Sequence, residues 1–246
     1  MEIDSELLKD LGKKQGLKNK EHIEKSWMQD HLLYYLSKKK DNLVFKGGTA
    51  LYKFYSLPRF SEDLDFSTKN LVDQDLIEEF CKTHRCTFNY KKVHDSNLYK
   101  LKLQGVLTKA NTLRVDINVT TSIYTSEIKT YISPYPDIPP FLVKTMSLKE
   151  ILAEKIHSVL NRTKARDLYD IFFILRIIDI TKENKELIIK KLHDREIMIQ
   201  EKDLLEQLTK RTKALSNLWT EELKHFILQE LPDFKIVRDF VLKKFE

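Results

Sequence analysis

Cysteine is scarce in this chain, and its scarcity excludes one class of protein. The 246 residues contain two cysteines, Cys81 and Cys86. Two thiols do not build the disulfide framework of a secreted domain, so we expect free thiols in a reducing compartment. His84 lies between them, which makes a metal cluster conceivable, but no second pair of ligands follows at a spacing that would complete a four-ligand site.

Long apolar runs are lacking as well. No segment approaches the roughly 18 consecutive apolar residues of a membrane-spanning helix. Residues 1–6 do not show the basic and then apolar order of a secretory signal. We therefore expect a cytoplasmic protein that does not associate with membranes.

The composition is that of a globular protein with a basic surface. Hydrophobic residues make up 41% and charged residues 33% of the chain, which is long enough for a sizeable core. The net charge is +6. An excess of cations suits a polyanionic partner such as RNA, DNA or a nucleotide, although a lysine-rich solvated surface gives the same balance.

Apolar periodicity predicts an alternation of helices and strands in the first part of the chain. The predicted elements are a helical stretch over 1–40, a strand over 43–45, a helix from Ala50 to Ser56 capped by Thr49, a strand within 59–67, a helix over 71–85, and strands over 98–107 and 113–119.

A proline-rich stretch divides the chain. Four of the six prolines fall within residues 133–140, which predicts a boundary between a domain of residues 1–140 and one of residues 141–246. Beyond it, Ser147 to Glu150 has the form of a capping box that opens a helix through Leu160. An apolar helix over 165–180 and amphipathic helices over 181–246 complete an α+β protein with a mixed sheet and a helical C-terminal domain.

Paired acids are the first candidates for chemistry. Asp63 and Asp65 are spaced i and i+2 on a predicted strand, so they point to one face and can share a hard cation such as Mg²⁺. Asp116 alternates with apolar residues on another strand and is the best third ligand. Three close acids repel without a cation, although acids on a solvated strand face would give the same pattern.

A glycine pair precedes those acids. Gly47 and Gly48 offer backbone N–H groups that an anion can approach closely, and the following helix N-terminus favours negative charge. The stretch lacks the Lys-Ser/Thr ending of a Walker A loop, and no G-x-G-x-x-G motif is present. By itself such a pair is usually a tight turn, so its value lies in its position before the acids.

These motifs occur together in one family. Lys46-Gly47-Gly48-Thr49-Ala50-Leu51, followed by Arg59-Phe60-Ser61-Glu62-Asp63-Leu64-Asp65-Phe66, closely resembles the signature of the AbiEii/AbiGii toxin family, nucleotidyltransferase-like proteins of the DNA polymerase β superfamily. Glu154-Lys155 resembles the family's lysine-bearing helix motif. Arg166-Asp167-Leu168-Tyr169-Asp170 resembles its Arg-x-Asp-type motif, so the resemblance covers residues 41–175.

The resemblance implies a role for each matched residue. Asp63, Asp65 and Asp116 would bind catalytic Mg²⁺, Gly47, Gly48 and Thr49 would cradle the triphosphate of an NTP, Lys155 would neutralise phosphate charge, and Asp167 would belong to the essential set. Wider superfamily members have Gly-Ser at the position of Gly48-Thr49, but the hydroxyl is kept here.

Physical chemistry leaves alternatives for the downstream motifs. Without the resemblance, the sequence favours a surface lysine on a charged helix for Lys155, and Arg166 can pair with Asp170 at i and i+4. Asp167 can act as a base, orient Lys155, or stabilise a helix N-terminus. Arg59 can contact phosphate or pair with Glu62.

The resemblance implies a Mg²⁺-dependent transfer of NMP from an NTP to an acceptor hydroxyl, in a cleft between the two domains. Related toxins suggest the 3′ end of tRNA as acceptor, which suits the basic charge, but a protein acceptor stays open. A metal-dependent nuclease and a nucleotide- or RNA-binding protein without turnover are the rival functions. If the toxin analogy holds, a cognate antitoxin is an expected partner.

Overall fold

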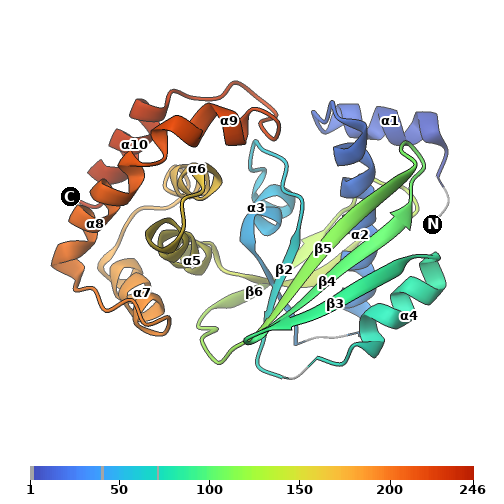
Figure 1. Cartoon of the computed structure of the whole chain (residues 1–246), viewed down its shortest axis with the longest axis horizontal. Coiled ribbons are helices and arrows are strands. Elements are labelled where there is room, and N and C mark those ends of the chain that lie inside the picture. The colour runs from blue at the N-terminus through green and yellow to red at the C-terminus, as the bar shows by residue number, and fades with distance from the viewer. Residues whose placement is uncertain (1–2, 40–41, 71) are drawn as a thin grey trace. The chain divides into compact units, whose positions relative to one another are not determined.

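The computed structural model describes residues 3–39, 42–70 and 72–246. They form two compact units (Figure 1). The first unit comprises Met1–Ser56 and Phe60–Met146, and the second comprises Leu57–Arg59 and Ser147–Glu246.

The first unit is built on a seven-stranded mixed sheet with the strand order β3-β4-β5-β2-β1-β7-β6. Its strands are β1 (Val44–Lys46), β2 (Leu64–Thr68), β3 (Thr87–Val93), β4 (Ser96–Gln104), β5 (Ala110–Val119), β6 (Ser126–Tyr131) and β7 (Phe141–Met146). The β1–β7 and β2–β5 pairs are parallel, and the other neighbours are antiparallel. The predicted α+β class with a mixed sheet is confirmed.

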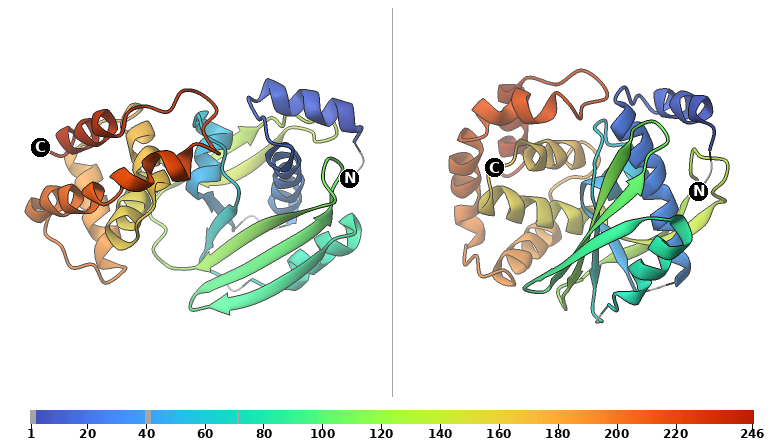
Figure 2. Two further views of the ribbon diagram at one scale, coloured as in Figure 1. Left: turned by 45° about the horizontal axis from the view of Figure 1, so that its top comes forward. Right: turned by 45° about the vertical axis from the view of Figure 1, so that its right-hand side comes forward.

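Helices cover one face of this sheet. The helices of the first unit are α1 (Ser5–Lys14), α2 (Lys20–Lys39), α3 (Gly47–Tyr55) and α4 (Asp75–His84). In Figure 1, α2 lies behind β4 and β5, and Figure 2 shows the same helix from two further directions. Tyr99, Val115 and Ile117, which are at most 1% exposed, form part of the core on the covered face. Period-two alternation leaves the polar residues of the same strands on the other face.

Several predicted boundaries in the first unit are wrong. The stretch over 1–40 contains two helices, because Gly16 adopts a positive φ of 79° between α1 and α2. Helix α4 begins at Asp75 rather than 71, and Leu71 lies outside the described residues. Strands β3, β6 and β7 were not predicted, and β3 and β6 are edge strands with several exposed polar residues.

The second unit is helical. Its elements are α5 (Leu148–Asn161), α6 (Ala165–Ile174), α7 (Lys182–His193), α8 (Glu201–Lys213), the short 3₁₀ helix η1 (Ser216–Leu218), α9 (Trp219–Leu223) and α10 (Phe234–Lys243). The Ser147 hydroxyl accepts a hydrogen bond from the Glu150 amide, as the capping box predicts. Helix α6 ends at Ile174, earlier than expected, but it is central, with Leu168 and Ile171 fully buried.

The two units divide after Met146, whereas the proline-rich stretch placed the expected boundary at residue 140. Strand β7 follows the prolines and pairs with β1 and β6, which keeps it in the sheet. Cys81 and Cys86 are free thiols. Among the described residues, no helix is long and apolar enough to cross a membrane.

Candidate nucleotide-binding site

Two of the predicted acids lie side by side on adjacent strands. Lys46 of β1 pairs with Asp65 of β2, and Asp65 pairs in register with Asp116 of β5. Paired residues point to the same face, and adjacent strands are about 4.8 Å apart, so the two carboxylates project together. Both residues are half-buried. This arrangement offers paired oxygen ligands of the kind that a hard cation prefers.

Asp63 is placed differently from the other two acids. It precedes β2, which begins at Leu64, and its backbone carbonyl accepts a hydrogen bond from the Thr49 hydroxyl. Within the part of the chain that the structure describes, no group of three or more His, Cys, Asp or Glu residues is arranged to hold a metal ion. Strand register therefore brings Asp65 and Asp116 together, and metal binding by these two acids, with Asp63 as the third ligand, stays a prediction.

Gly47 is required by its surroundings. It adopts a φ of +77°, a left-handed conformation that side chains rarely tolerate. A Cβ built at this position would overlap the Asp65 carboxylate and lie 3.2 Å from its Cγ. The sequence predicts that this glycine lets an anion approach the backbone closely. The structure adds a second reason, because the glycine lets the start of α3 lie against Asp65.

The helix after the glycine pair starts earlier than predicted. Helix α3 begins at Gly47 with Lys46 at the N-cap position, so the assignment of Thr49 as N-cap is wrong. Thr49 is fully buried, and its hydroxyl donates to Asp63, which ties the first turn of α3 to the segment that leads into β2. A lysine side chain has no acceptor with which to cap first-turn amides, and a helix N-terminus favours an anion.

Lys155 is a buried lysine in the second unit. It is 8% exposed, and its Nζ lies 2.9 Å from Asp167 Oδ1 and 2.7 Å from Asp170 Oδ2. The alternative of a surface lysine is therefore wrong. Both carboxylates are also buried, at 1% and 0% exposure. We call this group, with the two arginines described next, the ion cluster.

Two arginines complete the ion cluster. Arg59 donates from Nε and Nη2 to the two oxygens of Asp170, each at 2.7 Å. Arg162 donates to Asp167 from Nε at 2.8 Å and from Nη2 at 3.1 Å. Arg166 does not pair with Asp170 as one alternative held, and its guanidinium lies 5.5 Å from the ring centroid of Phe226.

The ion cluster favours the charged forms of Lys155 and Asp167. Burial alone lowers the pKa of Lys155, but the charges of Asp167 and Asp170 outweigh it, so the pKa is raised. Burial likewise acts to raise the pKa of Asp167, but Lys155 and Arg162 hold that pKa well below its usual range. Asp167 is therefore an ionised partner of two cations.

Sequence reasoning missed Arg59 and Arg162 as partners of the motif acids. Arg162 lies between the helix predicted through Leu160 and the helix predicted from residue 165, five residues before Asp167. Arg59 is 111 residues from Asp170. No periodicity or motif in a single sequence links positions so far apart.

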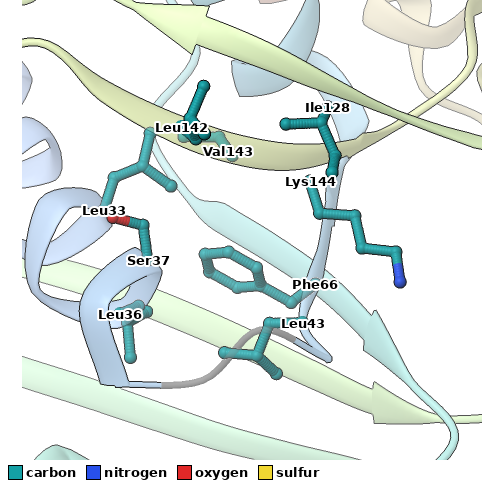
Figure 3. A pocket seen from close by; sticks show the side chains of 9 residues that line it. All are labelled: Leu33, Leu36, Ser37, Leu43, Phe66, Ile128, Leu142, Val143 and Lys144. Carbon is teal, nitrogen blue, oxygen red and sulfur yellow. The ribbon is translucent and has the colours of Figure 1, made fainter.

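One hollow in the first unit contains none of the predicted site residues. Its volume is about 350 Å³, and Figure 3 shows its mainly apolar lining from α2, β2, β6, β7 and the start of the β1 segment. Ser37 and Lys144 are its polar side chains. A triphosphate needs many hydrogen-bond donors, so we do not assign this hollow to the nucleotide.

Comparison with known families decides the identity. The family described as nucleotidyl transferase AbiEii toxin, type IV toxin–antitoxin system, matches residues 31–241. The chain belongs to the AbiEii nucleotidyltransferase toxin family. The resemblance carried by the glycine pair, the acids and the downstream motifs is thereby confirmed at the level of the family.

Solved structures share the fold of this AbiEii-family protein. The JHP933 protein of Helicobacter pylori is 20% identical, with a TM-score of 0.60 over 93% of this chain and 91% of that chain. MenT4, a nucleotidyltransferase toxin of Mycobacterium tuberculosis, is 18% identical, with a TM-score of 0.61 over 97% and 88%. At such identities the likeness shows the fold alone. No curated protein matches the chain by sequence.

Proposed function

We propose that this AbiEii-family protein is a Mg²⁺-dependent nucleotidyltransferase that moves an NMP from an NTP to the 3′ end of an RNA, with tRNA as the expected acceptor. The observation that carries the proposal is the register of Asp65 with Asp116 beside the N-terminus of α3. It combines a carboxylate pair for a cation with a helix terminus for phosphate.

The carboxylate pair fits a divalent cation. Asp65 and Asp116 would hold Mg²⁺, with Asp63 as the third ligand, because close carboxylates repel one another unless a cation lies between them. When bound, Mg²⁺ supplies Lewis-acid stabilisation of charge on the reacting phosphate. The residues fit this ion because all the ligands offered are oxygens, which Mg²⁺ prefers.

Backbone groups would hold the triphosphate. The first-turn amides of α3, from Gly47, Gly48 and Thr49, would donate to phosphate oxygens, because a helix N-terminus favours an anion. The acceptor hydroxyl oxygen forms a bond to the α-phosphorus and gives up its proton to solvent. The bond between that phosphorus and the oxygen that bridges it to the β-phosphate breaks, so pyrophosphate leaves. In this scheme the buried Thr49 hydroxyl donates to the segment before β2, and the Thr49 backbone amide donates to the nucleotide.

Lys155 and Asp167 take linked roles in the proposal. Lys155 neutralises phosphate charge, and Asp167 orients it rather than acting as a base, since a carboxylate with a depressed pKa is a weak base. The ion cluster contains three cations and two carboxylates, which leaves one positive charge. The side chain of Arg162 is 57% exposed and presents positive charge to solvent.

The test is a transfer assay with purified protein, total cellular RNA, Mg²⁺ and each labelled NTP in turn. We expect label on lengthened RNA, no label with a chelator, and no label with Asp65→Ala at unchanged circular dichroism. Full activity of Asp65→Ala overturns the metal assignment.

The same assay separates the rival functions. Shortened RNA indicates a nuclease, labelled protein indicates a protein acceptor, and NTP binding by calorimetry without pyrophosphate release indicates a binding protein without turnover. Because the family is that of type IV toxins, we also expect a cognate antitoxin partner.

A further inference from the structure

The face of β3, β4 and β5 that carries Asp116 also carries a set of cations. Residues paired across antiparallel strands share a face, and alternate residues along one strand do so too. Register therefore places the side chains of this face in three rows: Thr87, Lys102 and Thr112; Asn89, Lys100 and Arg114; and Lys91, Leu98 and Asp116. We call these three rows the basic sheet face.

The opposite face of the same strands belongs to the core. There Tyr90 pairs with Tyr99, and Tyr99 pairs with Val115. Tyr99 and Val115 are each 1% exposed. Because the strands alternate, the cations of the basic sheet face project away from this core. Lys91, Lys100, Lys102 and Arg114 are all exposed.

The charge of the basic sheet face is not balanced locally. Asp116 is the one acidic residue in the sequences of β3, β4 and β5. None of the four exposed cations forms an ion pair with a residue that the structure describes. Elsewhere in the same unit, Lys39 lies 2.7 Å from Glu79 and Lys82 lies 2.6 Å from Glu78. Adjacent unpaired cations repel each other, so a bound polyanion would stabilise this face.

We propose that the basic sheet face binds the phosphate backbone of the acceptor RNA next to the carboxylate pair. The inference rests on the proposed function, because it takes RNA as the acceptor. Arg114 lies two residues before Asp116 on the same strand, about 7 Å away along the strand. A strand of RNA held by these cations therefore has its end close to the two carboxylates.

The chemistry of the basic sheet face favours backbone recognition rather than base recognition. It carries no aromatic side chain in its three rows, so bases have no ring to stack on. Its cations suit phosphate oxygens, and Asn89, Thr87 and Thr112 add polar groups of the type that contact phosphate and sugar. Binding is thus expected to depend on salt and to tolerate changes of RNA sequence.

The test compares two neighbouring lysines on opposite faces. Lys91 belongs to the basic sheet face, whereas Lys92 pairs with Asn97 on the other face, and both are exposed. Lys91→Glu and Lys92→Glu make the same change in net charge one residue apart. Their affinities for a fluorescent single-stranded RNA are measured by anisotropy over a salt series, without NTP or Mg²⁺, so catalysis does not enter the readout.

We expect Lys100→Glu, Arg114→Glu and Lys91→Glu each to raise the dissociation constant several-fold and, combined, by at least about tenfold at low salt. Each lost phosphate contact should lower the slope of log K against log salt by about 0.7. Lys92→Glu should bind as the wild type does. Circular dichroism checks the fold. If Arg114→Glu does not fold, the same RNA affinities are measured with Lys100→Gln and Lys91→Gln.

The outcomes separate this inference from the proposed function. Unchanged RNA affinity in all three face variants overturns it, even if the wild type transfers nucleotides. An equal loss in Lys92→Glu also overturns it, because net charge rather than position then sets binding. If RNA binding is weakened in the face variants but not in Lys92→Glu, the basic sheet face binds RNA as inferred, even if no transfer is found with any NTP.

Discussion

The two groups of motif residues are held in opposite ways. In the sheet unit, Asp65 and Asp116 are half-buried and are placed by strand register. In the helical unit, Asp167 and Asp170 are buried, and each receives two cations at 2.7–2.9 Å. Backbone geometry thus positions the first pair, and side-chain charge positions the second.

Because of this difference, we expect the carboxylate pair to matter mainly for activity and the ion cluster mainly for stability. Strand register sets the backbone at Asp65 and Asp116, and both residues are only half-buried, so their loss should affect activity first. The carboxylates of the ion cluster hold α5, α6 and the segment around Arg59 together, and removing one leaves buried cations uncompensated. Substitutions in the two regions should therefore differ in kind.

The largest effect is expected at the carboxylate pair. Asp65→Asn keeps the shape of the side chain but removes the charge that would hold Mg²⁺, so nucleotide transfer should fall by about 10³-fold or more. The free energy of unfolding should change by less than about 1 kcal/mol, because the residue is placed by register. Single-turnover kinetics and urea unfolding measure the two. A loss of stability that matches the loss of activity would remove the distinction between the regions.

The ion cluster should show the reverse behaviour. Asp170→Ala leaves Arg59 and Lys155 buried without this carboxylate, which should lower the free energy of unfolding by about 3–5 kcal/mol. Asp179→Ala is the matched control, since Asp179 is 86% exposed and pairs with Lys244 in the same unit. Exposed pairs contribute little, so the control should unfold with the wild type. Equal urea midpoints for both variants would contradict the assignment.

Much of the sheet site could be predicted from sequence because its signals are local. The i and i+2 spacing of Asp63 and Asp65 predicted that these two acids share one face of a strand, and the alternation around Asp116 predicted the face on which that acid lies. Strand pairing then brings the two together. The N-cap assignment of Thr49 was wrong because the glycine pair was expected to form a turn between the strand and the helix. Instead, the glycine pair forms the start of the helix, since α3 begins at Gly47.

The ion cluster could not be predicted because its contacts are not local. Lys155, Arg162 and Asp167 fall within a short stretch, but Arg59 joins them from 111 residues before Asp170. A sequence also does not report burial. Without the family resemblance it favoured a surface position for Lys155, whereas this side chain is buried in the structure. The family motif identified these positions without indicating how they are paired.

Gly47 tests whether the backbone positions the sheet site. Gly47→Ala places a Cβ against the Asp65 carboxylate at a φ of +77°, so it should destabilise the fold by about 1–2 kcal/mol and also reduce transfer. Gly16→Ala is the control, with a φ of +79° in the loop between α1 and α2. It should lose similar stability and retain transfer. Equal transfer by the two variants would show that only strain matters at position 47.

The smallest effect is expected in acid, and it concerns the ion cluster. Because Lys155 and Arg162 hold the pKa of Asp167 below its ordinary value of 3.8, the unfolded chain takes up a proton below about pH 4 before the native protein does. The stability that Asp167 contributes is therefore fully present above that pH and is lost as the pH falls further.

Urea unfolding of the wild type from about pH 5 to about pH 2 should show a steeper loss of stability than unfolding of Asp167→Asn. Glu230→Gln, which removes an exposed carboxylate of the same unit, should follow the wild type. If Asp167→Asn has the same acid dependence as the wild type, Asp167 does not stabilise the helical unit through its charge.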